Sequence, residues 1–527
     1  MMDLDKTGEI ENEMERKVAQ PPRVKLVKGF TDSFKNVIAT ARTCYSSKGI
    51  IEDETVDVEK YQDLALSIYE AGHHTTFQHA TFQFQLSNVS RQFIWSFLHS
   101  HPFYNSEQVS QRYVEVKEGN YFIPPLAGEA LALFIETADM QVRAYRKLVE
   151  ILMRPAGEEY YRIFPKRTAD KRFASEIKKK AQEIARYVLP VATFSYLYHT
   201  VSGVTLLRYA KMCSSGDVPF EQRIIVGMMV QELLAFEPNY RLVLEEPLPE
   251  NYFTENIIDR GRGLAERNYS NFIGEFDREM GDHTSKLVDY KVNSEMAIAD
   301  SVREILGKSK NDLPDSEALE LAVNPVRNKI LSNSLVLTTH DKISRALYHA
   351  SYTFKKKLSH TADSQDQRHR MTPASRPVIA EHVGENPDYI VPHLMMLEEN
   401  AERIYRETME RTWCGIYKLL TMNVSKEFAA YLLPNAFPIR FTESADLLNL
   451  HHKAEMRLCY NAQEEIWKAS LDEVEQIKGV HPNLGKYLLP PCTIRMMAGT
   501  KPYCPEGKRY CGVPVWRLDT SKYSRTI

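Results

Sequence analysis

The chain has 527 residues, of which 43% are hydrophobic and 26% are charged, and its formal net charge is −3. This composition is typical of a folded protein with roughly two to four domains. Because 67 basic residues balance 70 acidic ones, the chain has no overall basic field, which argues against a nucleic-acid binder.

The expected location follows from three absences in the sequence. No run of about 18 apolar residues occurs, so we expect no membrane span. The first residues, MMDLDKTGEIENEMERK, are acidic and polar and lack the pattern of a secretory signal. Seven scattered cysteines do not form a disulfide framework. A reducing, cytoplasmic environment is therefore expected.

Hydrophobic periodicity predicts helices and strands in both halves of the chain. Apolar spacing near 3.6 indicates a helix, and alternating aromatic or β-branched residues indicate a strand. In chain order we predict a helix at 33–43, a strand at 81–88, a buried helix at 223–236, a helix with a linker at 256–283, a helix at 295–306 and a strand at 351–357.

Short sequence matches recur in the same order in the two halves. The letters KLV begin at Lys25 and at Lys286, and an arginine follows 17 residues later in each case. HATFQF at His79 returns as HASYTF at His349, an offset of 270, and ARYVLPVA returns as AAYLLPNA, an offset of 244. Repeats of this kind indicate duplicated structural units.

We therefore predict two divergent copies of one domain. Copy one covers 20–255, a linker helix covers 256–283, and copy two covers 284–527, including a C-terminal segment with cysteines. Each copy is expected to combine a sheet with helices, which is the α+β class.

A basic triplet lies in copy two, within QDQRHRMTPASRP at 365–377. Arg368, His369 and Arg370 are adjacent, and the next acidic residue in the chain is Glu381. Three neighbouring side chains that can carry positive charge repel one another. The stretch is therefore either a solvated basic turn or a site that holds an anion.

The two copies retain different basic residues. The offset of 270 aligns the triplet with residues 98–100, and the offset of 244 aligns Arg457 with Cys213 and Arg186 with Ala430. Copy one therefore carries Glu107, Ser110, Arg112 and Arg186, and copy two carries the triplet and Arg457. Either the copies complement each other or both have decayed.

These residues resemble the flavin-dependent thymidylate synthase family. The R-H-R triplet follows by about 19 residues a histidine that opens an aromatic strand. The remaining motifs are H-x-x-x-F-x-H at His73, Phe77 and His79, S-x-R-Y at Ser110 to Tyr113, A-R-x-x-L-P at Ala185 to Pro190, and ARTCYSS at 41–47. They are divided between the copies, and neither copy contains the whole signature.

The resemblance implies two tandem copies of that family's α+β fold, each a mixed sheet packed with helices. It implies methylation of dUMP to dTMP, with methylenetetrahydrofolate, a folate, as carbon donor, NADPH as reductant and FAD as cofactor. Family sites are built from several subunits, so the copies are expected to share composite sites. A homodimer of this chain would supply four domain copies.

The resemblance also assigns roles to individual residues. Arg368, His369 and Arg370 are expected to hold the flavin, together with His73 and His452. The expected substrate-binding residues are Gln365, Glu107, Ser110, Arg112, Arg186 and Arg457. Arginines suit a dianionic phosphate because the guanidinium is planar and bidentate. Arg457, with Arg368, is the catalytic candidate, because a cation near the uracil carbonyl stabilises negative charge developing there.

One family element is absent from both copies. The N-x-R element that holds the flavin nucleotide falls on Ser202 and Val204 in copy one, and on Asp446 and Leu448 in copy two. At the next family position His452 and Arg208 could partly substitute for it.

The C-terminal segment contains a separate candidate site. Cys492, Cys504 and Cys511, with Cys459 or His481, would be enough ligands for tetrahedral zinc. Their spacing is not that of a tight C-x-x-C knuckle, and buried or free thiols are the alternative. Neighbouring lysines and arginines would lower the thiol pKa values.

The sequence also permits alternatives to an enzyme and to these site assignments. The chain could be a catalytically degenerate relative that binds a nucleotide or flavin in a regulatory or structural role. His79 and His349 could be core residues of their strands. Arg186 and Arg457 could be surface ion-pair partners, and Ser110 could belong to a solvated turn.

Overall fold

Two four-stranded sheets organise the computed structural model, which describes residues 21–112, 114–163, 173–253, 269–525 and 527. In the first sheet the strand order is β1-β2-β4-β3, and in the second it is β5-β6-β8-β7. The strands are β1 (Arg23–Gly29), β2 (Thr81–Ser90), β3 (Asn105–Gln108), β4 (Phe194–Ser202), β5 (Ser285–Tyr290), β6 (Ser351–Ser359), β7 (Ala374–Ser375) and β8 (Pro438–Asp446). The α+β class and the tandem arrangement are confirmed.

The expectation of mixed sheets needs one correction. Every pair of neighbouring strands in the two described sheets is antiparallel. The physical reason is that the chain enters neighbouring strands from opposite ends, as an antiparallel ladder requires.

Strand register in the two sheets reproduces the offsets read from the sequence. In copy one Phe84 pairs with His199, and in copy two Phe354 pairs with Glu443. These positions differ by 270 on the first strand and by 244 on the second. The internal repeat is therefore a structural one, in which equivalent residues occupy equivalent places in the two sheets.

A β-bulge in copy one changes the counterpart of the triplet. β2 contains one extra residue, Asn88, with a φ of 56°, and the register shifts between Ser87 and Val89; β6 shows no such shift against β8. Beyond the bulge the offset becomes 269, so the triplet corresponds to 99–101, His-Ser-His, rather than to 98–100. Histidines replace both arginines.

Helices cover the sheets and join the copies. In copy one they are α2 (Ser33–Thr43), α3 (Val58–Glu70), α4 (Arg91–His99), α5 (Gly128–Ile163), α6 (Ala174–Ala185), α7 (Gly203–Lys211) and α8 (Phe220–Phe236). The later ones are α9 (Tyr269–Met280), α10 (Ser294–Leu306), α11 (Asp315–Val323), α12 (His360–Asp366), α13 (His393–Met396), α14 (Glu399–Thr421), α15 (Lys426–Ala429), α16 (Leu447–Arg457), α17 (Glu464–Val480), α18 (Pro482–Gly485) and α19 (Pro491–Met497).

The predicted elements are present, with one difference. The helices at 33–43 and 295–306 and the strands at 81–88 and 351–357 correspond to α2, α10, β2 and β6. The segment 223–236 belongs to α8, which is not buried all round, because Ile224 and Phe236 remain more than a third exposed. α8 lies on the first sheet, where it packs against β1 and β2 and also against α7. A helix on the surface of a sheet keeps one face in solvent.

The helix expected within 256–283 is α9, and residues 256–268 lie outside the described residues. Asp277 on α9 pairs with Lys357 at 2.7 Å and with Arg440 at 3.0 Å. These contacts attach α9 to the second sheet. No helix of the described chain is long and apolar enough to cross a membrane.

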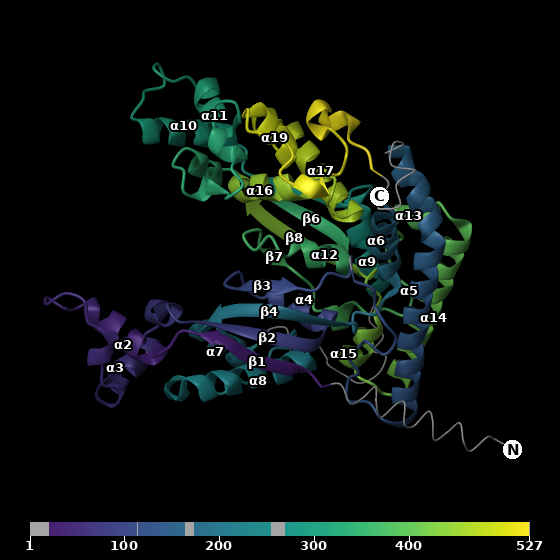
Figure 1. Cartoon of the computed structure of the whole chain (residues 1–527), viewed down its shortest axis with the longest axis horizontal. Helices are drawn as coiled ribbons and strands as arrows, with labels where there is room; N and C mark the ends of the chain where they lie inside the picture. The colour runs from purple at the N-terminus through teal and green to yellow at the C-terminus, as the bar shows by residue number, and fades with distance from the viewer. Residues whose placement is uncertain (1–20, 113, 164–172, 254–268, 526) are drawn as a thin grey trace.

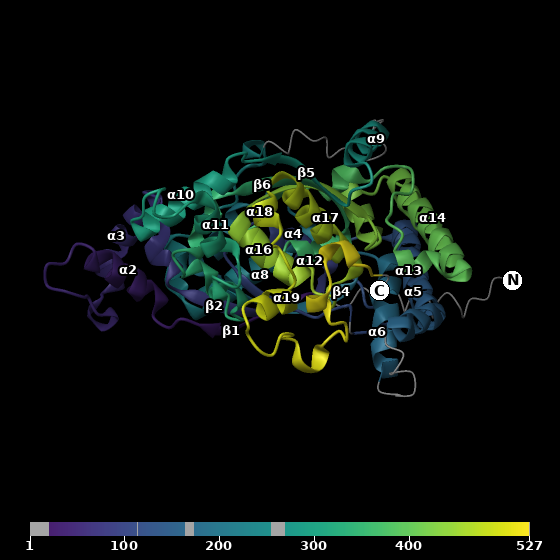
Figure 2. The ribbon, with the colours of Figure 1, turned by 90° about the horizontal axis from the view of Figure 1, so that it is seen from above.

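The two copies share a hydrophobic core at one side of the molecule. The long helices α5 and α14 lie side by side there, while α2 and α3 lie at the opposite end (Figures 1 and 2). One cluster of buried side chains combines residues of both copies, including Leu148, Leu152, Ile416 and Leu419. A copy separated from its partner would expose this surface, so the fused pair behaves as one folding unit.

An approximate two-fold relation connects the copies. The backbone of Val191 donates to Leu433 at 2.8 Å, and that of Asn435 donates to Leu189 at 2.8 Å. Each pair is converted into the other by the offset of 244. Equivalent segments of the two copies therefore exchange hydrogen bonds across a pseudo-axis near the bridge between Pro190 and Pro434.

Candidate functional site

The triplet follows α12 and reaches across to copy one. Arg368 donates from Nη2 to the carbonyl oxygen of Ser106 and lies 3.7 Å from Glu107. Arg370 donates to the carbonyl oxygen of Pro102 at 3.1 Å. The loop therefore makes contacts across the boundary between copies, and a freely solvated turn would not.

The middle residue of the triplet points to copy two instead. His369 accepts a hydrogen bond at Nε2 from Nε of Arg457 at 2.8 Å, and Nη2 of Arg457 donates to the carbonyl oxygen of Gln365 at 2.6 Å. Burial holds the pKa of His369 well below its usual range, and the charge of Arg457 acts in the same direction. The imidazole is therefore neutral, as its charged neighbours predict.

The expected copy-one residues converge on the same region from the other side. The hydroxyl of Ser110 accepts from the backbone of Arg112 at 3.2 Å. Arg112 donates from Nε to Glu183 and from Nη2 to the carbonyl oxygen of Asn461 in copy two, the latter at 2.8 Å. Arg186, which is buried, donates from Nε to the carbonyl oxygen of Glu183 at 3.2 Å.

Positive charge is concentrated where the copies meet. Burial lowers the pKa of Arg457 to about 10; the charges of Arg112 and Arg368 act in the same direction, and the charge of Asp366 opposes them. Burial and the charge of Arg186 lower the pKa of Arg91 to about 9. Such values mean that the cations are poorly compensated, because a paired guanidinium keeps its charge easily.

Glu183 is a carboxylate bonded within this group of arginines; the charge of Glu465 also reaches Arg186, and that of Asp366 reaches Arg457. Burial opposes ionisation of Glu183, but Lys180, Arg112 and Arg186 together lower its pKa to about 2. This charge satisfies only part of the neighbouring donors. Nη2 of Arg186 and Nε2 of Gln111 are buried and have no hydrogen-bond partner among the described residues. Buried donors without partners are costly, so the arrangement suits an anionic ligand.

Sequence reasoning missed a chain of amides through the site. Gln365 donates to Oε1 of Gln463 at 3.2 Å, and Gln463 donates to the hydroxyl of Tyr187. Asn435 donates to Oε1 of Gln111 at 3.2 Å. Gln111 and Asn435 lie inside the S-x-R-Y and L-P segments, so the motifs contained them; Gln463 becomes recognisable only from its contacts.

The two histidines expected at the cofactor differ in position. The ring of His452 is 5.9 Å from that of His369, edge to face, and its Nδ1 has no described partner. His73 is exposed, and no described contact joins it to the triplet. Its neighbour His74 lies 3.4 Å from Nη2 of Arg208. The structure thus brings His452, and not His73, to the triplet.

Arg208 extends the positive region along copy one. Burial lowers the pKa of His101 to about 4, and the charges of Arg208 and Arg370 contribute in the same direction. His101 therefore lies within electrostatic reach of both guanidinium groups. Arg208, the residue named as a partial substitute for the missing N-x-R element, is consequently part of the same surface.

The C-terminal cysteines give the expected zinc site no support. The described residues contain no group of three or more histidine, cysteine, aspartate or glutamate side chains placed to hold a metal ion. Cys492, Cys504 and Cys511 pack against the shared hydrophobic core. Burial raises the pKa of Cys492 to about 11, and Cys511 and Cys504 act in the same direction, opposite to the lowering expected from nearby lysines and arginines.

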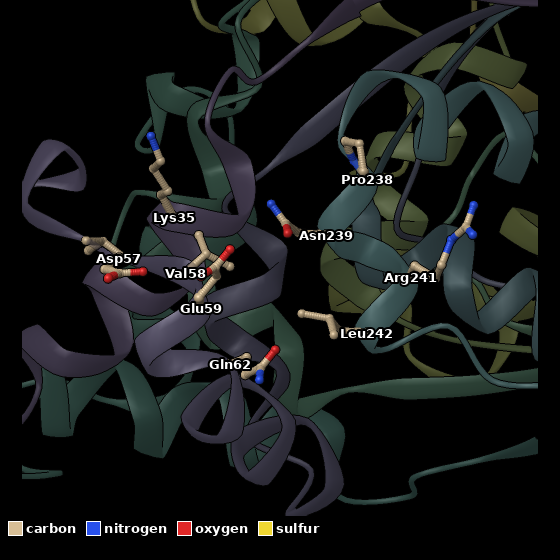
Figure 3. A pocket seen from close by; sticks show the side chains of 10 residues that line it. Lys35, Asp57, Val58, Glu59, Gln62, Pro238, Asn239, Arg241 and Leu242 are labelled. Atoms are coloured by element: carbon tan, nitrogen blue, oxygen red, sulfur yellow. The ribbon is translucent and has the colours of Figure 1, made fainter.

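Two cavities lie outside the arginine-rich region described above. The larger, about 590 Å³, is enclosed by the segment 56–62 of copy one and by the 3-10 turn Pro238–Leu242 (Figure 3). Lys35 and Arg241 line it on opposite sides, and none of the expected site residues contributes to it.

The smaller cavity, about 160 Å³, lies between the copies. Its lining includes Asp217, Glu381, Glu427 and Tyr431. By the offset of 244, Asp217, Glu427 and Tyr431 correspond to Asn461, Glu183 and Tyr187 of the arginine-rich region. It is therefore the pseudo-symmetric counterpart of that region, and its described lining contains three carboxylates and Lys426 but no arginine.

Comparisons with known proteins fit this architecture. The sequence model of the family described as thymidylate synthase complementing protein matches residues 25–239 and 286–483, one segment in each copy.

Individual relatives match about one copy. The flavin-dependent thymidylate synthase of Clostridium tetani is 28% identical over 221 residues, which is 41% of this chain and 84% of the relative. That of Sulfolobus acidocaldarius is 27% identical over 213 residues, 40% of this chain and 78% of the relative. Among solved structures, the UMP/dUMP methylase PolB of Streptomyces cacaoi, bound to 5-Br dUMP, is 20% identical and covers 41% of this chain and 92% of its own, with a TM-score of 0.28.

Proposed function

The chain belongs to the family of thymidylate synthase complementing proteins, and from that premise we propose that it methylates dUMP to dTMP in a flavin-dependent reaction at a composite site. Copy two supplies the triplet, Gln365 and Arg457, and copy one supplies Glu107, Ser110, Arg112 and Arg186. Methylenetetrahydrofolate is the carbon donor and NADPH the reductant, and two chains associate into a homodimer.

The observation that carries the proposal is the group of undercompensated cations between the copies. Arg112 of copy one bonds to the backbone of Asn461 in copy two, and the charge of Arg112 reaches Arg457. Arg186 keeps a buried donor without a described partner. Excess buried positive charge is unfavourable in the free protein and is relieved by a dianionic phosphate.

The residues present also suit a flavin nucleotide. Arg368, Arg370 and Arg208 offer positive charge, and His452 offers a ring nitrogen without a described partner. When bound, FAD supplies the hydride chemistry that amino-acid side chains lack. The triplet's part is to bind and orient it, with His369 neutral and held by Arg457.

Arg457 is the proposed catalytic residue. Its guanidinium is partly buried and already oriented by His369 and Gln365. A cation fixed beside the uracil carbonyl stabilises the negative charge that appears on oxygen when carbon 5 becomes nucleophilic. Because the group is oriented before substrate binds, little reorganisation is needed in the transition state.

FAD titration of Arg368→Ala tests the proposal. The wild-type protein is expected to bind FAD with a flavin absorption band and to convert dUMP when methylenetetrahydrofolate and NADPH are present. Losing one charged contact costs about 1.5–3 kcal/mol, so the variant's FAD affinity should fall about 10- to 100-fold and its turnover should be lost. Arg403→Ala is the matched control, because Arg403 is an exposed arginine on α14 that pairs with Glu407.

The outcomes separate the alternatives. A wild-type protein that neither binds FAD nor converts dUMP would contradict the proposal. FAD and dUMP binding without turnover would favour a catalytically degenerate relative in a regulatory or structural role. If Arg368→Ala and Arg403→Ala lost FAD affinity and turnover to the same extent, the triplet would not be part of the site.

A further inference from the structure

We infer that a buried charge network, formed by Lys356, Asp366, Glu443, Lys453 and Glu473, positions the triplet loop (residues 367–373) for ligand binding. The inference rests on the proposed function, and it adds positioning residues that lie beneath the site and do not contact a ligand themselves. None of them occurs in the family motifs identified in the sequence.

The network joins five secondary-structure elements of copy two. Lys356 of β6 contacts Asp366 of α12 at 2.6 Å, Glu473 of α17 at 2.9 Å and Glu443 of β8 at 3.3 Å. All of these side chains are essentially inaccessible to solvent.

A second lysine completes the network from α16. Lys453 contacts Asp366 at 3.0 Å and Glu473 at 3.5 Å, and it donates to Glu443. Two lysines thus face three carboxylates with no solvent between them. Removing either lysine would leave three buried carboxylates to share one cation, which is strongly unfavourable, whereas each lysine has two other carboxylates if Glu443 is neutralised.

Both ends of the triplet loop are attached to this network. At the start, the carbonyl oxygen of Asp366 accepts from the backbone of His369 at 3.0 Å. At the end, the hydroxyl of Thr372 donates to the carbonyl oxygen of His369 at 2.8 Å and lies 3.3 Å from Oε2 of Glu443. The backbone that carries Arg368 and Arg370 is therefore held from below, while their side chains reach toward copy one.

Copy one offers a natural comparison, because it lacks both the arginines and the network. The structural offsets pair Lys356 with Leu86, Asp366 with Phe97, Glu443 with His199, Lys453 with Tyr209 and Glu473 with Met229. Phe97 stacks on Tyr209 with ring centroids 4.3 Å apart, and its centroid is 4.6 Å from that of His199. An aromatic cluster thus occupies the same place in an otherwise equivalent fold.

The comparison with copy one distinguishes a role in positioning the triplet loop from a role in stabilising the fold. Apolar residues of similar volume often replace a buried ion network at no loss of stability, or with a gain, and copy one shows that this fold accepts such a replacement. Copy two keeps five buried charges under the one loop that carries the arginine triplet. Holding that loop in a single geometry, rather than stabilising the fold, accounts for their presence.

Protonation of the network provides a readout that a purely structural role would lack. Burial and the charge of Asp366 raise the pKa of Glu443 to about 7, whereas Lys356 and Lys453 keep the pKa of Asp366 well below its usual range. The charged groups facing Glu443 are Lys356, Asp366, Lys453, Glu473 and Arg376, and Thr372 is its hydroxyl neighbour. Ionisation of Glu443 therefore adds a negative charge beneath an anion-binding loop.

The test measures FAD dissociation constants against pH for the wild type and Glu443→Gln. The pyrophosphate of FAD stays ionised throughout, so the wild-type affinity should fall about tenfold between about pH 6 and about pH 8 as Glu443 loses its proton. Glutamine mimics the protonated carboxyl, so the variant should keep the low-pH affinity across the range.

Glu221→Gln is the matched control. Glu221 is a buried glutamate of copy one whose pKa burial raises to about 7, and it bonds to Ser90, not to the triplet loop. This variant should retain the wild-type pH dependence. The inference is overturned if Glu443→Gln keeps that dependence or if Glu221→Gln abolishes it. A wild-type protein without FAD affinity overturns the proposed function and this inference with it.

Thr372→Val tests the attachment without removing a charge. Valine keeps the shape but loses the hydroxyl between the loop and Glu443, so we expect about tenfold weaker FAD binding, as for other residues that act by orienting a ligand-binding group, at an unchanged melting temperature. Thr412→Val removes a buried hydroxyl on α14 that donates within its own helix and should leave FAD affinity unchanged. Equal FAD affinities of Thr372→Val and wild type would show that the network does not hold the loop.

Discussion

Arg186 and Arg303 are equally buried, each 5% exposed, yet their surroundings are opposite. Arg303 is paired with Asp300 and with Asp315, the latter at 2.8 Å. Arg186 has no carboxylate bonded to its guanidinium, and its Nη2 lacks a described partner. A buried arginine that is fully paired supports the fold, whereas one left undercompensated is available to a ligand.

Arg186→Met should therefore weaken dUMP binding about 10- to 100-fold, the cost of one charged hydrogen bond, without lowering the melting temperature. Arg303→Met should do the reverse, because it removes the buried guanidinium's contacts with Asp300, Asp315 and the carbonyl oxygen of Leu313. Isothermal titration with dUMP and thermal melting of both variants measure the contrast. Loss of stability in Arg186→Met with intact dUMP affinity would identify Arg186 as a structural residue.

At the scale of elements, the segments around Pro190 and Pro434 connect the copies through matched contacts. Tyr187 of copy one donates to Glu465, which also binds the backbone and hydroxyl of Ser359. Tyr431 of copy two donates to Glu221 at 3.2 Å. Each tyrosine thus completes a serine–glutamate pair of the opposite copy, and each serine caps the helix that follows its strand.

Tyr187→Phe and Tyr431→Phe should each destabilise the protein by about 1–3 kcal/mol, because each leaves a buried carboxylate short of one donor. Only Tyr187 also accepts from Gln463, which contacts Gln365. We therefore expect Tyr187→Phe alone to weaken dUMP binding as well. Urea unfolding measures the loss of stability, and dUMP titration measures the loss of affinity. Equal dUMP affinities of the two variants would show that the amide chain does not contribute to the site.

At the scale of the whole molecule, the two copies are fused in one chain, and this has allowed the two regions where they meet to diverge in charge. One gathers Arg91, Arg112, Arg186 and Arg457. Its counterpart is lined by Asp217, Glu381 and Glu427, with Lys426 beside them, and has no arginine among its described lining residues. From this difference we expect a single nucleotide site for each chain.

Equilibrium dialysis should accordingly find one dUMP bound per chain, and therefore two per homodimer. A second phosphate would meet carboxylates instead of guanidinium groups, and that electrostatic penalty is large in a cavity of low polarity. Sedimentation of the protein at the same concentration gives the number of chains. Two equivalent dUMP molecules per chain would contradict the charge argument.

Local patterns in the sequence determined much of this protein. The periodicity of 33–43 and 81–88, the offsets of 270 and 244, and the motifs around Arg368 and Arg186 predicted the α+β class, the duplication and the family, because these features depend on short-range spacing. Residues of both copies were expected at one site on the basis of their complementary losses.

Only the tertiary structure decided which side chains meet and what surrounds them. It brought His452, and not His73, to the triplet and packed the cysteines into a core, and it placed the single inserted Asn88 that moved the triplet's counterpart by one residue. It also brought together Lys356, Asp366, Glu443, Lys453 and Glu473 from five elements. Burial and charge compensation depend on contacts between residues far apart in the chain, and no local pattern encodes them.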